Sequence, residues 1–143
     1  MVITTKCSNN RLITTVGVVN KENDLSYRVN AIWDTGAPFS VLDRDIIDKL
    51  NLPFISYMTI GGIEATPKEV GQYSTYLLLH SNTELLPIVV TEFKQITKDN
   101  IQMIIGMDII KLGIFTIKPV DKNVVMTWEF IPEETNNLNN KNE

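Results

Sequence analysis

The sequence has little of the two residue types on which most metal and redox sites depend. Its 143 residues include one cysteine, Cys7, and one histidine, His80. A single cysteine excludes an intrachain disulfide and a cysteine-rich zinc site, and no second histidine is present to build a zinc site of another kind. His80 ends an apolar stretch and is expected to be structural or exposed rather than catalytic. We therefore expect no zinc site.

Clustered positive charge and long apolar runs are also missing. The 13 Lys and Arg residues are scattered, and with 17 Asp and Glu they give a formal net charge of -4. Because phosphate backbones are bound by clustered Lys and Arg, nucleic acid is not an expected partner. The longest apolar runs, such as residues 85–90, are too short to span a bilayer. The first ten residues lack the features of a signal peptide, so we expect no membrane partner and a cytoplasmic location.

What the sequence does contain is a series of short strand-like segments. β-Branched and aromatic residues are concentrated between turn residues. The expected strands are residues 12–19, 25–33, 39–42, 54–60, 63–79, 85–90, 103–105, 114–117 and 124–130. Gly61-Gly62 is a strong signal for a hairpin tip, and Pro67 and Gly71 are expected to interrupt the longest segment. This pattern predicts an all-β fold, a small closed or nearly closed β-barrel.

Two short helices are expected among these strands. The segment 43–51 begins with Asp43, a plausible N-cap, and ends with Asn51, which suits the left-handed C′ position. The segment 107–112 is followed by Gly113, which we expect to close the second helix in the same way. Each helix follows an apolar strand and a glycine loop, which indicates a duplicated strand–loop–helix unit.

The chain divides into one domain and a tail. Residues 1–131 are enough for a single domain with one core. Residues 132–143 include five Asn and almost no apolar side chains. We expect this tail to be disordered.

The chemistry is concentrated in residues 31–42, with the sequence AIWDTGAPFSVL. Asp34 lies between apolar segments, where an isolated charge is costly to bury. The hydroxyl of Thr35 can lock the loop through backbone hydrogen bonds, and Gly36 lets another backbone or a substrate approach closely. Asp-Thr-Gly alone is also an ordinary turn. The flanking apolar strands and a second glycine loop downstream favour a functional loop over a turn.

Here the sequence resembles the retropepsin-like aspartic proteases of retroviruses and bacteria. Asp34-Thr35-Gly36-Ala37 matches the active-site motif of that family, and Ile104-Ile105-Gly106 resembles its second signature. Gly61-Gly62-Ile63 lies between them, where the family places the tip of its flap hairpin. The resemblance covers residues 16–130 and implies the acid-protease barrel with a flap and one or two short helices.

The resemblance also implies residue roles. Asp34 would be the catalytic carboxylate, Thr35 would form hydrogen bonds across a dimer axis, and Gly36 would line the cleft. The residues expected to contact substrate are Ala37, Ile60, Gly61, Gly62, Ile63, Ile105 and Gly106, of which the last two would also buttress the catalytic loop. No metal and no other cofactor would be needed, because water attacks the peptide bond between two carboxylates that share one proton.

The second carboxylate is expected from another copy of the chain. Only one Asp-Thr-Gly is present, and the chain is too short for a two-lobed enzyme. The expected enzyme is therefore a homodimeric aspartic endopeptidase with one Asp34 from each subunit on a twofold axis. Asp108 is a rival second acid within one chain, but its position at a helix start favours N-terminal capping. Extended peptides or unfolded protein segments are the expected substrates.

Several departures from the family keep alternatives open. Pro38-Phe39 follows the motif where retroviral members carry acidic residues, and Met107 stands where they carry arginine. One alternative is a catalytically weak or inactive module that binds peptides or proteins with the same fold. Another is a monomer that pairs only at high concentration or with a host protein. Ala37, in place of the serine of many two-lobed enzymes, predicts a pH optimum shifted towards neutrality.

Overall fold

The structure is a computed structural model that describes residues 2–61, 66–78, 84–94 and 100–132. Strands and two short helices make up most of these residues. The elements are β1 (Val2–Lys6), β2 (Ile13–Asn20), β3 (Leu25–Trp33), β4 (Val41–Asp43), α1 (Arg44–Leu50), β5 (Phe54–Ile60), β6 (Lys68–Leu78), β7 (Leu85–Phe93), β8 (Met103–Ile105), α2 (Met107–Ile110), β9 (Gly113–Val120) and β10 (Asn123–Phe130).

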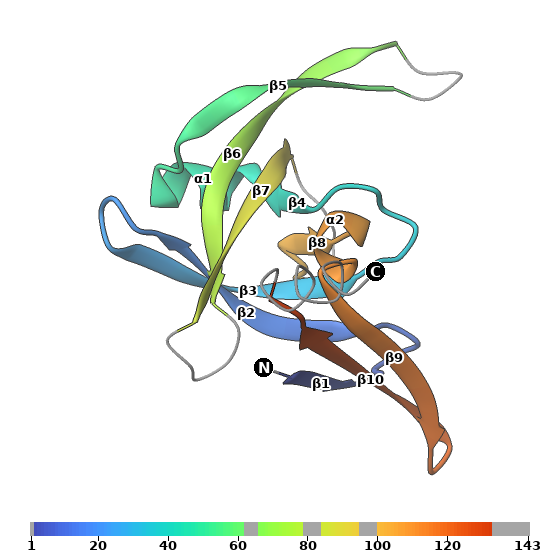
Figure 1. The fold of residues 1–143 in the computed structure, drawn as a ribbon. Coiled ribbons are helices and arrows are strands. Elements are labelled where there is room, and N and C mark those ends of the chain that lie inside the picture. Colours follow the sequence, from blue (N-terminus) through green and yellow to red (C-terminus); the bar gives the residue numbers. More distant parts are fainter. Residues whose placement is uncertain (1, 62–65, 79–83, 95–99, 133–143) are drawn as a thin grey trace, which may run out of the picture.

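The larger sheet closes into a barrel. Its strands follow the order β2-β3-β8-β4-β7-β6-β5, and an additional pairing joins β2 to β6. This pairing closes the sheet before β5, and within the described part of the chain β5 is paired with β6 alone. A second sheet, in the order β1-β10-β9, lies below the barrel in Figure 1. The small closed β-barrel predicted from the sequence is confirmed.

Aromatic packing joins the two sheets at the end of β3. The ring of Trp33 lies 5.6 Å from that of Trp128 in β10 and 6.1 Å from that of Phe115 in β9, measured between centroids. Both indole nitrogens are satisfied, since Trp33 donates to the Thr14 hydroxyl at 2.8 Å and Trp128 to the Ile110 carbonyl at 3.1 Å. Buried aromatic rings contribute large apolar areas to a core. The end of β3 is thereby fixed, and the chain then enters the Asp34 loop.

The strands differ from the sequence prediction mainly at the edges. The bounds of β3 and β8, which flank the Asp34 loop, are those predicted. β1 was not predicted, although it buries Ile3 and Thr5 in alternation and pairs with β10. The expected interruption at Gly71 is wrong, because β6 continues through it from Lys68 to Leu78.

The first helix has its predicted caps and the second does not. The carboxylate of Asp43 accepts from the amide of Asp45 at 2.9 Å, and Asn51 is left-handed with φ 49° and ψ 50°. α2 ends at Ile110, and Gly113 does not close it: no described glycine has a positive φ, and Gly113 begins β9. Glycine is needed there for space, because a Cβ would lie 2.3 Å from the carbonyl oxygen of Glu129.

Some predictions concern residues outside the described ranges. His80, the hairpin-tip residues Gly62 and Ile63, and the predicted tail from residue 133 onward lie outside the described residues. In the described ranges, no helix has the length and hydropathy needed to cross a membrane.

Candidate active site

The Asp34 loop is held at its first residue by the barrel. Trp33 pairs with Ile105 in the parallel β3–β8 ladder, and the amide of Asp34 continues that ladder by donating to the Ile105 carbonyl at 2.9 Å. The amide of Gly36 donates to Asp34 Oδ1 at 2.9 Å, which is the geometry of an Asx turn. One carboxylate oxygen is thus fixed by the loop's own backbone.

The part of the loop that carries Asp34 is exposed to solvent in the single chain. Asp34, Thr35 and Gly36 are exposed, and Ala37 is half-buried. Among the described residues, the Thr35 side chain has no hydrogen-bond partner, and the Asp34 carboxylate has none beyond the Gly36 amide. The described residues therefore do not shield Asp34 from water. The loop is accessible to water, to substrate or to a second chain.

The second glycine loop is hydrogen-bonded to the first and supports it. The amide of Met107 donates to the Ala37 carbonyl at 2.8 Å, and the amide of Gly106 donates to the Ser40 hydroxyl at 2.9 Å. A Cβ on Gly106 would lie 2.7 Å from the Ala37 carbonyl oxygen and 2.8 Å from the Phe39 carbonyl carbon. Because these are backbone atoms, they cannot move aside without displacing the Asp34 loop.

Asp108 ties this support together and is not the helix N-cap. Gly106 occupies the N-cap of α2, without a side-chain cap, and Asp108 lies in the first turn. Its Oδ2 accepts from the Ser40 amide at 3.0 Å and its Oδ1 from the Ser40 hydroxyl at 2.7 Å. Oδ1 also accepts from the amide of Ile109 at 3.0 Å. The capping role predicted for Asp108 is thus replaced by a link between α2 and the Asp34 loop.

Ser40 is the site residue that sequence reasoning missed. It is fully buried, and its hydroxyl donates to Asp108 while accepting from Gly106. The available signal was a serine placed directly before the apolar Val41-Leu42 pair of a short strand. A buried hydroxyl needs hydrogen-bond partners, so such a position predicts a polar link.

A row of side chains connects the face of the barrel beside Asp34 with β6. Residues opposed in register share a face of a sheet, and alternate residues of a strand do so too. The row runs through Ile32, Ile104, Val41, Thr91 and Gln72, on β3, β8, β4, β7 and β6. Asp34 follows Ile32 by two residues, so it extends from β3 on the side of this row. Register, which the sequence does not specify, is what brings these residues together.

The predicted substrate-contacting residues fall into two groups. Ile105 and Gly106 are buried in the single chain, where they support the Asp34 loop; their contact with substrate stays a prediction. Ile60 ends β5, opposite Lys68, and Gly61 follows it in an exposed position. A cavity of about 230 Å³ between this hairpin and the end of β7 is lined by Ile60, Lys68, Val70, Glu92, Phe93 and Lys94.

The donor chemistry of the site is that of carboxylate, hydroxyl and backbone groups. Across the described part of the chain, no three His, Cys, Asp or Glu side chains gather in a way that could hold a metal ion. The arrangement therefore offers one exposed carboxylate on a fixed loop, beside a mainly apolar sheet face.

Comparison with known proteins gives matches only among solved structures. No protein-family model and no curated protein matches the sequence. The crystal structure of a retropepsin-like aspartic protease from Rickettsia conorii aligns over 90% of this chain and 91% of its own, with 11% identity and a TM-score of 0.56.

Two further solved structures are less similar. EIAV protease, complexed with the inhibitor HBY-793, shares 22% identity over 72% of this chain and 88% of its own, with a TM-score of 0.47. The retroviral protease-like domain of Ddi1 from Leishmania major shares 19% identity over 85% of this chain and 95% of its own, with a TM-score of 0.46. The match to the Rickettsia structure and the closed barrel agree, and the chain has a retropepsin-like fold.

Proposed function

We propose that the chain is one subunit of a homodimeric aspartic endopeptidase in which two Asp34 residues, one from each subunit, activate water. The observation that carries this proposal is an exposed carboxylate on a rigid loop. Asp34 is bonded through its main chain to Ile105 and through Oδ1 to the Gly36 amide, while the rest of its carboxylate is open. A catalytic group has to be both accessible and held in place.

The proposed chemistry needs two such carboxylates close together. Two carboxylates at short range share one proton, because both cannot ionise easily. The ionised one accepts a proton from the attacking water, and the protonated one polarises the scissile carbonyl.

Two observations support a second subunit as the source of the other carboxylate. Asp108, the rival within the chain, uses both oxygens to hold Ser40. In addition, Phe39 and Met107 flank the interlocked loops and are 44% and 38% exposed. Large apolar side chains beside a polar functional loop are a surface that a partner can cover. A second copy would supply the carboxylate and bury Asp34 at the same time.

The β5–β6 hairpin is the proposed flap over an extended peptide. In Figure 1 the hairpin projects from the barrel towards the side of the view on which the β3–β4 loop lies. Ile60 and Gly61 would lie near its tip and close over the substrate, and the row from Ile32 to Gln72 would face the peptide side chains. We also propose a cytoplasmic setting, in which unfolded segments are available as substrates.

The test is cleavage of a diverse peptide library by the wild type and by Asp34→Asn, from acidic to neutral pH, with sedimentation to establish the oligomer. Asparagine keeps the size of the side chain but cannot share the proton. We expect cleavage by the wild type alone. Cleavage that survives in the variant would point to a contaminant or another mechanism. A demonstrably dimeric wild type that cuts nothing would favour the binding module instead.

A further inference from the structure

The β5–β6 hairpin leaves the barrel at Gly71. β6 pairs with β7 from Leu78 as far as Gln72, whose partner is Thr91. β6 continues to pair with β5 as far as Lys68, whose partner is Ile60. Residues 57–60 and 68–71 therefore form a two-stranded segment, the distal hairpin, to which no third strand of the described residues is paired (Figure 1). A two-stranded hairpin has little stability of its own, so its orientation depends on how its root is held.

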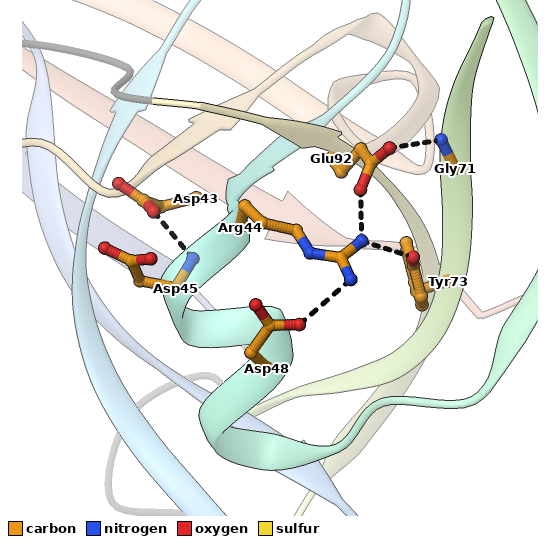
Figure 2. Close-up of polar contacts among 7 residues, drawn as sticks. All are labelled: Asp43, Arg44, Asp45, Asp48, Gly71, Tyr73 and Glu92. Atoms are coloured by element: carbon orange, nitrogen blue, oxygen red, sulfur yellow. Dashed lines mark hydrogen bonds and ion pairs between the residues drawn. The ribbon is translucent and has the colours of Figure 1, made fainter.

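Where the β6–β7 ladder ends, a side chain of β7 accepts the next hydrogen bond from β6. The amide of Gly71 donates to Oε1 of Glu92 at 2.8 Å, as Figure 2 shows. Glu92 is the next-to-last residue of β7 and follows Thr91, the last β7 residue paired with β6. Its carboxylate thus supplies the acceptor for the first β6 amide beyond the ladder.

Arg44, the first residue of α1, holds this carboxylate from the other side. Its Nη1 pairs with Oε2 of Glu92 and donates to the Tyr73 hydroxyl at 2.5 Å. The Tyr73 ring in turn covers Gly71, where an added Cβ would lie 2.8 Å from Cε2 of the ring. Arg44, Glu92, Gly71 and Tyr73 therefore form a closed ring of contacts around the hairpin root (Figure 2).

The ring is partly shielded from water. The side chains of Arg44 and Glu92 are 35% and 23% exposed. Partial burial acts to raise the pKa of Glu92, but the Gly71 amide and the Arg44 guanidinium outweigh it, and the pKa lies below its ordinary value. Hydrogen bonds to a charged acceptor are stronger than neutral ones. The junction is consequently firmer than an exposed ion pair.

We propose that Arg44 and Glu92 are positioning residues that set the angle of the distal hairpin to the barrel, and through it the affinity for the peptide that the hairpin covers. The part of this inference that concerns substrate rests on the proposed function. No hydrogen bond or ion pair among the described residues joins Arg44 or Glu92 to the Asp34 loop. The pair therefore acts on binding and not on the chemical step.

The test compares Glu92→Gln with Asp48→Asn in the full chain. Asp48 is the other ion-pair partner of Arg44, at 3.0 Å, and its 57% exposed side chain does not contact the hairpin root through any hydrogen bond, so it is a matched control. We expect Glu92→Gln to speed amide hydrogen exchange at Gly71 and in the distal hairpin about tenfold, because a charge-assisted bond is lost. Exchange in the β2–β3 ladder should not change, and Asp48→Asn should leave both regions as in the wild type.

Peptide kinetics provide the second readout. Glu92→Gln should raise KM about three- to tenfold and leave kcat within about twofold, as expected for lost binding without lost chemistry. Arg44→Lys, which keeps a charge for Glu92, should retain most of the exchange protection that Arg44→Met loses.

Distinct outcomes overturn the inference. Unchanged exchange at Gly71 in Glu92→Gln, equal loosening in Asp48→Asn, or faster exchange throughout the barrel would each contradict it. A fall in kcat at constant KM would do so as well. A wild type without any cleavage would overturn the proposed function, while the exchange data would still decide whether the pair fixes the hairpin.

Discussion

The Asp34 loop and the β5–β6 hairpin are attached to the same barrel in different ways. The loop is bonded to β8 through Ile105, to α2 through Met107 and to Asp108 through Ser40. Among the described residues, the distal hairpin is joined to the rest of the barrel by side chains instead: the ring of contacts at Gly71 and a weak contact of the Thr91 hydroxyl with the Met58 sulfur. The difference fits the two proposed tasks: a carboxylate that takes part in chemistry must not move, whereas a segment that covers a substrate has to open and close.

The comparison predicts that damage to the loop supports affects folding and chemistry, while damage to the hairpin root affects binding. The largest effect is expected from Gly106→Ala. The new Cβ would lie within 2.8 Å of backbone atoms of Ala37 and Phe39. We expect a loss of about 3 kcal/mol in the free energy of unfolding, at the upper end of overpacking costs, measured by urea denaturation.

Gly36→Ala is the matched control for that substitution. Its Cβ would meet only Asp34 Oδ1, at 3.2 Å, in an exposed loop. Stability should change by less than about 1 kcal/mol, while cleavage falls because the carboxylate is displaced. If the two substitutions destabilised the fold equally, Gly106 would not differ from Gly36 in its importance for holding the Asp34 loop.

The next largest effect on stability and activity is expected from removal of the Asp108 carboxylate. Asp108→Ala leaves the buried Ser40 amide without its acceptor, and an unsatisfied buried group costs about 1–3 kcal/mol. We expect that loss of stability together with a lower kcat, because the Asp34 loop loses its link to α2. Asp45→Ala, at an exposed residue of α1, is the comparison for unfolding and kinetics. A normal kcat in Asp108→Ala would show that this link does not position the loop.

Tyr73→Phe should have a smaller effect, limited to the hairpin. It removes the hydroxyl that accepts from Arg44 but keeps the ring over Gly71. A lost hydrogen bond of this kind is worth about 1 kcal/mol. We expect a modest rise in KM for peptides, with kcat and the exchange rates of the β2–β3 ladder unchanged. A drop in kcat would place Tyr73 in the chemistry instead.

The smallest effect is a pH dependence at the hairpin root. The pKa of Glu92 is lowered in the folded chain, since the Gly71 amide, Arg44 and Lys94 favour the carboxylate over the burial that opposes it. A lowered pKa stabilises the folded state at pH values above the pKa of Glu in the unfolded chain, about 4.3. This contribution is lost as the pH falls through the pKa of Glu92 in the folded chain. The stability gap between the wild type and Glu92→Gln should therefore narrow below about pH 4, measured by thermal unfolding. A gap that does not depend on pH would contradict this assignment.

The sequence predicted the parts of the fold that depend on local chemistry. Asp43 and Asn51 cap α1 as expected, because capping requires only a suitable side chain or a tolerated backbone angle. β3 and β8 were correctly bounded, since their apolar runs end at the motif and at Gly106. β1 was missed because five residues become a strand only when β10 pairs with them.

The candidate site was predictable in its motif but not in its supports. Asp34-Thr35-Gly36 is contiguous, so it is visible in the sequence. The Ser40–Asp108 link joins residues 68 positions apart, and Glu92 meets Gly71 across 21. Such pairs depend on register and on which elements pack together, neither of which local propensity specifies. Gly113 shows the same limit, since its place is dictated by Glu129 rather than by a helix end.

The central claim is that one active site uses Asp34 from two chains, and subunit mixing tests it most directly. Wild type and Asp34→Asn are combined in varying ratios at constant total concentration, allowed to exchange subunits, and assayed on a peptide that the wild type cleaves. If both carboxylates are needed, activity falls with the square of the wild-type fraction, to about one quarter in an equal mixture, because only like pairs of wild-type subunits are active. A linear fall, to about one half, would show that each chain acts alone and would contradict the shared site.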